Sequence, residues 1–268
     1  MISGPKSRVF FTALCLWPAG LLEANVIVNT SISLIQLTIT PQSGSIMFVA
    51  PENSPPDCTS AHFCATAFTQ AQDSLGGFSQ QYKVADNGAT TSSASTALAS
   101  AMGKASVPAL TAMATSAVKI ISVDASASSS AMGKPASLVG TFEVSIATAL
   151  NISATIASNQ SLSTDIFGVS AFSEAIFSVQ LDNGDIPVFF DNPLSIGPNT
   201  SLVDIRDPHT LPGSTSMLQA NTPYSIFIQT DAESQGVNSV PEPSSVSLTV
   251  LALAGLIAVH SARRKKSA

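Results

Sequence analysis

Apolar and polar residues alternate in several short runs along the chain, which is the period of half-buried β-strands. The clearest runs cover residues 32–40, 137–150, 150–158, 176–181, 186–190 and 224–230. Two of them flank the tetrapeptide Asp182-Asn183-Gly184-Asp185, and Asn-Gly between apolar runs is a strong hairpin signal. Short strands separated by turns predict a mainly β fold, an antiparallel β-sandwich-like body.

Residues 88–137 have a different composition, rich in Ala, Ser and Thr, and they contain Ser-Ala-Met-Gly-Lys twice, at 100–104 and 130–134. One interpretation is a flexible, low-complexity stalk. The other is a set of small-residue strands, with a hairpin, around the candidate strand at 118–125. Two copies of a pentapeptide are too few to predict a solenoid.

Charge is scarce and unevenly placed. Only 10% of the 268 residues are charged, against about 25% in an ordinary soluble domain. Between residues 25 and 240 there are five cations and fifteen carboxylates, a net charge of −10 for that segment. Because nucleic-acid binding depends on neutralising phosphates with Lys and Arg, we expect no nucleic-acid partner.

The N-terminal residues 1–24 have the three parts of a secretory signal peptide. Lys6 and Arg8 form a basic region, residues 9–17 are apolar, and small residues follow. With Leu22 and Ala24 at the −3 and −1 positions, cleavage after Ala24 is expected. We also expect the Sec translocon to export the body of the protein (25–239). The alternative is a buried helix or an uncleaved anchor.

The C-terminal residues 240–266 contain a Pro-Glu-Pro turn, one apolar span and a basic cluster. The span 244–262 has 19 residues, which as a helix is about 28 Å long and just crosses a hydrocarbon core of about 30 Å. We therefore predict a transmembrane helix there. The basic cluster is Arg263, Arg264, Lys265 and Lys266, and by the positive-inside rule it stays cytoplasmic while the body lies outside.

This tail, with Val240, Pro241, Glu242 and Pro243 ahead of one span and the basic cluster, resembles the bacterial PEP-CTERM sorting signal. The resemblance implies that exosortase recognises the Pro-Glu-Pro motif and removes or exchanges the segment after it. It also implies a cell-surface or extracellular-matrix location in exopolysaccharide-producing, biofilm-forming bacteria, with exopolysaccharide as a partner. Ala/Ser alternation is common in ectodomains of this family, which favours strands within 88–137. A plain single-pass anchor is the alternative.

No cofactor or metal is expected from the remaining side chains. Cys58 and Cys64 predict a disulfide in an exported chain, and the alternative metal site with His62 lacks a fourth nearby ligand. Asp182, Asn183 and Asp185 could bind calcium, but without the rest of an EF-hand loop they indicate a hairpin turn.

No motif nominates a catalytic residue, so we expect a structural or adhesive role instead of an enzyme. His209 lies in the turn-rich residues 206–213 and is expected in a solvated loop. A polysaccharide hydrolase stays an alternative if two of Asp182, Asp185, Asp191 and Asp204 face each other. A carbohydrate-binding module is a further alternative, disfavoured because Trp17 leaves with the leader and only Tyr82 and Tyr224 remain.

Overall fold

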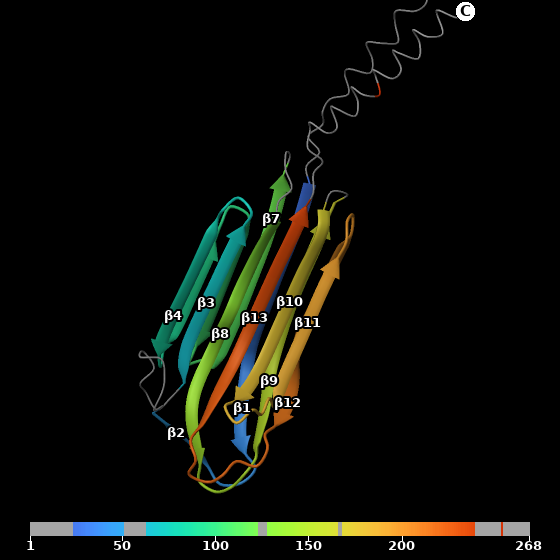
Figure 1. Ribbon diagram of the computed structural model, residues 1–268. Coiled ribbons are helices and arrows are strands. Elements are labelled where there is room, and N and C mark those ends of the chain that lie inside the picture. Colours follow the sequence, from blue (N-terminus) through green and yellow to red (C-terminus); the bar gives the residue numbers. More distant parts are fainter. Residues whose placement is uncertain (1–23, 51–62, 123–127, 166–167, 239–252, 254–268) are drawn as a thin grey trace, which may run out of the picture.

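The computed structural model describes residues 24–50, 63–122, 128–165, 168–238 and 253, and within them the chain forms two antiparallel β-sheets packed face to face (Figure 1). Sheet A has the strand order β12 (Ser201–Ser214), β9 (Leu150–Thr164), β1 (Ala24–Pro41), β7 (Thr111–Ser122), β6 (Ala99–Ser106), β5 (Ala89–Ser95). Sheet B has the order β11 (Val188–Ile196), β10 (Gly168–Leu181), β13 (Tyr224–Asn238), β8 (Ser128–Val144), β3 (Cys64–Asp73), β4 (Phe78–Asp86), and β2 (Ile46–Val49) also pairs with β8.

The predicted mainly β, antiparallel fold is confirmed. The alternating run at 32–40 is the second half of β1, and 150–158 begins β9. The predicted hairpin is β10 and β11, which pair from Val179 with Val188 onward, and Gly184 takes a positive φ of 95° in the turn that joins them.

The Ala/Ser/Thr-rich segment contributes strands to both sheets. It forms β5, β6 and β7 of sheet A and the first half of β8 in sheet B. The two Ser-Ala-Met-Gly-Lys copies lie on β6 and β8, in different sheets, so they are not successive copies of one structural unit. These strands keep their place with small side chains because β6, β7 and β8 are each hydrogen-bonded to a neighbouring strand on both sides. Strand β5 is the exception, because it lies at the edge of sheet A.

The predicted transmembrane helix at 244–262 lies outside the described residues, apart from Leu253. Among the residues that the structure describes, no helix has the length and apolar character needed to cross a bilayer. The predicted signal peptide, 1–24, is likewise outside the described residues, apart from Ala24, the first residue of β1.

A belt of buried polar side chains divides the hydrophobic core in two. On β1, Val26 and Val28 belong to one apolar cluster and Ile32 and Leu34 to the other, and Thr30 lies between them. On neighbouring strands, too, a buried polar residue at the same level separates the residues of one apolar cluster from those of the other. The belt consists of Thr30, Ser116, Gln160, Ser173, Asn192 and Ser234, contributed by β1, β7, β9, β10, β11 and β13, and all are buried.

Hydrogen bonds between hydroxyl and amide groups join the two sheets through this belt. Thr30 Oγ1 lies 2.6 Å from Ser173 Oγ and 2.9 Å from Ser234 Oγ, and Ser234 Oγ lies 2.8 Å from Ser116 Oγ. Because these polar groups are shielded from water, each depends on its partners in the belt. The belt therefore fixes the relative position of the sheets at one level.

The belt ends at the exposed edge of the sandwich in an ion pair on β12. Asn192 Nδ2 donates to Asp204 Oδ2 at 2.7 Å, and Arg206 Nε lies 3.1 Å from the same oxygen. The hydrogen bond from Asn192, followed by that from Arg206, lowers the pKa of Asp204 below its usual value.

Two other carboxylates have pKa values lowered by hydrogen bonds. The Ser216 side chain is the main cause for Asp185, and the Thr96 side chain for Asp73. A lowered folded-state pKa means that the unfolded chain binds protons first, so stability is full above the unfolded value near 4 and is lost as pH falls through the folded value.

We expect the free energy of unfolding to decrease as pH falls below about 4 and through the folded-state pKa values of these carboxylates, as urea titrations at a series of pH values would measure. Asp185→Asn should flatten this dependence, because it removes one of the three carboxylates whose pKa is lowered by hydrogen bonds. A pH profile identical in the variant and the parent chain would contradict the assignment of Asp185.

Candidate functional site

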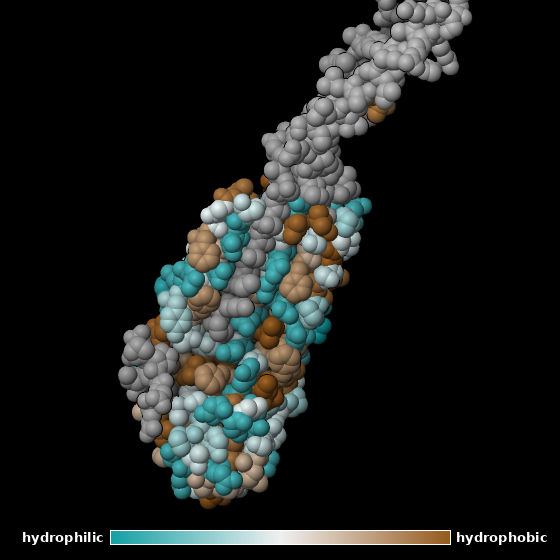
Figure 2. Space-filling model, in the orientation of Figure 1, coloured by the Kyte–Doolittle hydropathy of each residue, from teal (hydrophilic) through white to brown (hydrophobic). Residues whose placement is uncertain are grey.

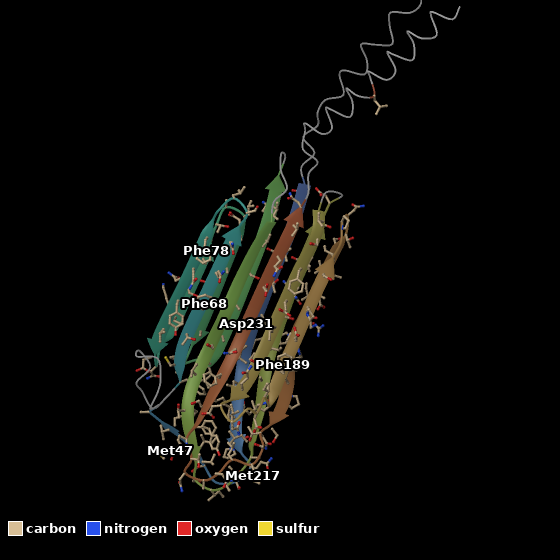
Figure 3. The ribbon with its side chains drawn as sticks, in the orientation of Figure 1. Met47, Phe68, Phe78, Phe189, Met217 and Asp231 are labelled. Carbon is tan, nitrogen blue, oxygen red and sulfur yellow. The ribbon has the colours of Figure 1, made fainter. Side chains whose placement is uncertain are left out.

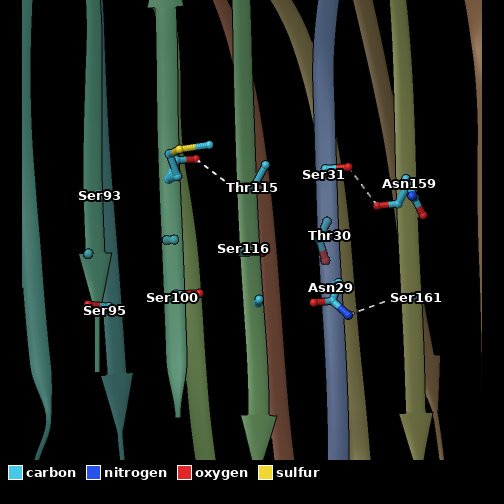
Figure 4. A pocket seen from close by; sticks show the side chains of 14 residues that line it. Asn29, Thr30, Ser31, Ser93, Ser95, Ser100, Thr115, Ser116, Asn159 and Ser161 are labelled. Atoms are coloured by element: carbon cyan, nitrogen blue, oxygen red, sulfur yellow. Dashed lines mark hydrogen bonds between the residues drawn. The ribbon is translucent and has the colours of Figure 1, made fainter. Parts of the chain in front are cut away.

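The outer face of sheet A carries a shallow groove of about 450 Å³ above the polar belt (Figure 4). It is lined by residues of five adjacent strands, β9, β1, β7, β6 and β5, and we call it the hydroxyl groove. Its lining is Asn29, Thr30, Ser31, Ser93, Ala94, Ser95, Ser100, Ala101, Met102, Thr115, Ser116, Ala117, Asn159 and Ser161.

Strand register arranges the outward-facing members of this lining in two rows across the sheet. One row runs Asn159, Ser31, Thr115, Met102, Ser93, and the next runs Ser161, Asn29, Ala117, Ser100, Ser95. Side chains on one face of a sheet repeat every second residue, so the two rows are neighbours. The face is hollow here because nearly all of these side chains are small.

The rows continue onto edge strand β12 with two large apolar residues. Val203 is paired with Ser161 and Ile205 with Asn159, and they are 62% and 64% exposed. At the groove itself, Asn29 Nδ2 donates to Ser161 Oγ at 3.2 Å, and Ser31 Oγ donates to the Asn159 carbonyl at 3.4 Å. A hydroxyl oxygen has two acceptor lone pairs, so these groups can still bond a polar ligand.

Acidic residues are concentrated on the opposite sheet. The strands of sheet A contain three cations (Lys104, Lys119, Arg206) and two carboxylates (Asp204, Asp207), both on β12. The strands of sheet B contain two cations (Lys83, Lys134) and seven carboxylates (Asp73, Asp86, Glu143, Glu174, Asp191, Asp231, Glu233). The acidity inferred from composition is therefore a property of sheet B and the loops, and the hydroxyl groove is free of it.

The outer face of sheet B combines carboxylates, among them Asp191 and Asp231, with exposed aromatic rings (Figures 2 and 3), whereas Asp73 is buried. Phe78 and Phe189 are each 59% exposed and Tyr82 is 55% exposed. Tyr82 is paired with Phe68 of the adjacent strand, and Asp231 lies between this aromatic pair and Phe189 in Figure 3. Only Trp and Tyr were counted as sugar-stacking rings in the sequence, so Phe78 and Phe189 were not predicted; they share a face only once β4 and β11 are assigned to the same sheet.

The candidate calcium residues hold the β10–β11 turn and the loop beside it. Asp182 Oδ2 accepts a hydrogen bond from Ser225 N at 2.9 Å, and Asp185 N donates to Asn183 Oδ1 at 3.1 Å. Asp185 Oδ2 accepts from the backbone and hydroxyl of Ser216, at 2.8 and 2.6 Å. Among the described residues, no three His, Cys, Asp or Glu side chains are grouped so that they could hold a metal ion.

The carboxylates proposed for a hydrolase are distributed over different parts of the sandwich. Asp182 and Asp185 belong to the hairpin turn, and Asp191 is exposed on β11 beside Asn192, which faces the core. Asp204 lies on β12 of the other sheet, where it is hydrogen-bonded by Asn192 of β11 and paired with Arg206 of its own strand. None of the described residues that line the hydroxyl groove carries a carboxylate, imidazole, amine or thiol.

The turn-rich sequence predicted that His209 lies in a loop, and this prediction is wrong. His209 lies in strand β12, which has an irregular register between Arg206 and His209, and its ring centroid is 5.6 Å from that of Phe190. The Arg206 guanidinium lies over the same Phe190 ring, 5.3 Å from its centroid. The two prolines at 208 and 212 are compatible with a strand because β12 is at the edge of its sheet.

The remaining predicted residues lie at or beyond the limits of the described chain. Cys64 is disulfide-bonded, while Cys58, its predicted partner, and His62 are outside the described residues. The sorting motif Val240 to Pro243 and the basic cluster Arg263 to Lys266 are outside them as well.

Comparison with known proteins found no matching family model, no matching curated protein and no matching solved structure.

Proposed function

We propose that this chain is an exported bacterial cell-surface or extracellular-matrix protein whose sandwich has a non-catalytic, structural or adhesive role. The sequence of the tail supports the location, by its resemblance to a PEP-CTERM signal, which implies exosortase as a partner. The signal-peptide pattern at 1–24 implies the Sec translocon. The hydroxyl groove supports the role, since its lining offers hydroxyl and amide groups in a fixed lattice and no acid–base pair.

Such a groove suits a hydroxylated polymer such as exopolysaccharide. Its hydrogen-bond donors and acceptors are held at fixed spacings by five hydrogen-bonded strands. Binding to a chain of sugar hydroxyls therefore costs little conformational entropy on the protein side. Sheet A also presents few carboxylates, so an acidic polymer would meet little repulsion on this face.

A carbohydrate-binding module that uses sheet B is the second candidate. Phe78, Tyr82 and Phe189 favour it, because exposed rings can stack on the CH face of a sugar. The two candidates therefore place the polymer on opposite faces of the same sandwich.

The test is retention of the full-length protein on isolated matrix polysaccharide. Ala117→Phe should fill the groove and raise the dissociation constant for the polymer about tenfold, the effect of losing roughly 1.4 kcal/mol of binding energy. Ala89→Phe, a matched change on exposed β5 outside the groove lining, should leave binding unaltered. Loss of binding in Tyr82→Ala with no loss in Ala117→Phe would instead place the polymer on sheet B.

A further inference from the structure

Four of the edge strands that the structure describes, β12, β11, β4 and β5, differ in how they are protected against pairing with another chain. Strand β12 contains two prolines and an irregular register, β11 contains Pro193, and β4 contains Lys83 and Asp86. Prolines, charges and bulges are the usual devices that keep sheet edges apart. Strand β5, Ala-Thr-Thr-Ser-Ser-Ala-Ser, contains none of them and is covered at one amide, that of Ser93, by the Gln81 side chain of β4.

The hydrogen bonds of β5 show which of its backbone groups point away from the sheet. Ser93 N donates to Gln81 Oε1 at 2.7 Å, so the backbone of Ser93 faces away from β6. Backbone groups alternate in direction along an antiparallel strand, so Thr91 and Ser95 also present their N–H and C=O groups outward. Thr91, Ser93 and Ser95 therefore form an outward ladder, and a strand that pairs along all of it must displace the Gln81 side chain from Ser93 N.

The chemistry of this edge suits a second copy of the same chain. A β5 strand added from a second copy would bring no charge, because β5 contains only Ala, Thr and Ser. On the other side of β5, the one charged residue that β6 pairs with it is Lys104, opposite Thr91. Two acidic proteins with a net body charge of −10 repel each other over most of their surface, and β5 is a neutral place where they can meet.

We propose that β5 is a self-association edge, at which two copies pair their β5 strands antiparallel. The contact is isologous, so it closes at a dimer and does not propagate. Full overlap sets Thr91 of one copy opposite Ser93 of the other. The outer faces of the two A sheets then form one surface, and the two hydroxyl grooves, each lined in part by β5, lie next to each other across the axis. The proposal does not depend on what the groove binds.

Sedimentation velocity of the full-length protein in a non-ionic detergent, over a concentration series, tests this. The parent chain should show a monomer–dimer equilibrium. Thr91→Pro removes an outward N–H but no bond to β6, so it should raise the dimer dissociation constant about tenfold or more. Thr91→Val keeps the N–H and should leave the constant unchanged.

Two further variants keep the result clear if the proline disturbs folding. Ser95→Lys adds a charge at the edge and should weaken the dimer, while Gln81→Ala removes the side chain that competes for Ser93 N and should strengthen it. A monomer at every concentration, open-ended assembly, or association that is equal in all variants, as contact through the apolar tail would produce, overturns the proposal.

Discussion

Gln160→Leu is expected to lower the free energy of unfolding by about 3 kcal/mol, although leucine is apolar and close in size. Gln160 is fully buried, and its Nε2 donates to Ser173 Oγ at 2.8 Å and to the Asn192 carbonyl at 2.9 Å. Its Oε1 accepts a hydrogen bond from Asn192 Nδ2. Leucine removes these three bonds, while Ser173 Oγ keeps its bond to Thr30 and Asn192 Nδ2 keeps its bond to Asp204. Each lost bond in the buried belt costs about 1–1.5 kcal/mol, offset in part by the apolar gain.

The neighbouring residue gives a matched control for this prediction. Asn159 lies on the same strand but faces outward and is exposed, so Asn159→Leu should change stability by about 0.5 kcal/mol or less. Urea unfolding, followed by fluorescence or circular dichroism, measures both variants. Equal losses in the two would mean that the belt does not carry the stability assigned to it.

Replacing Pro241, Glu242 and Pro243 together with alanine is expected to abolish C-terminal processing in a host that has exosortase. By the family resemblance these three residues form the recognition motif, and the two prolines also keep a helix from extending back through it. The protein should then stay in the inner membrane or be released with its span and basic cluster attached. Deletion of Arg263 to Lys266 should have the same effect.

Mass spectrometry of the mature C-terminus measures this outcome. The parent chain should end near the motif, and Ser244→Ala with Ser245→Ala, which preserves both the motif and the span, should end at the same place. A parent chain that keeps residues 244–266 in such a host would show that the tail is only an anchor.

Alternation of side chains was sufficient to predict the antiparallel β class and several strands, but it did not predict β3, β4, β12 or the strand order of the sheets. Residues 32–40 and 224–230 lie within β1 and β13, because one face of each strand is buried and the other is not. The start of β1 was missed, since Asn29, Thr30 and Ser31 interrupt the apolar series. Thr30 nevertheless keeps the phase of Val28 and Ile32, and that phase, more than its polar type, indicates that it faces the core.

The hydroxyl groove could not be predicted from the sequence, because it depends on register between distant strands. Ser31 is brought beside Thr115 and Asn159 by pairing on both sides of β1. No short motif encodes such a contact. The separation of charge between the sheets has the same origin, since it emerges only when each strand is assigned to its sheet.

The most direct test of a non-catalytic role is to incubate the purified full-length protein with extracellular polysaccharide from its own host and to measure the bound fraction and new reducing ends together. The proposed role predicts that the protein is retained by the polymer while the number of reducing ends stays at the level of the protein-free control. Reducing ends that increase with time and with protein concentration would show turnover, and would contradict it.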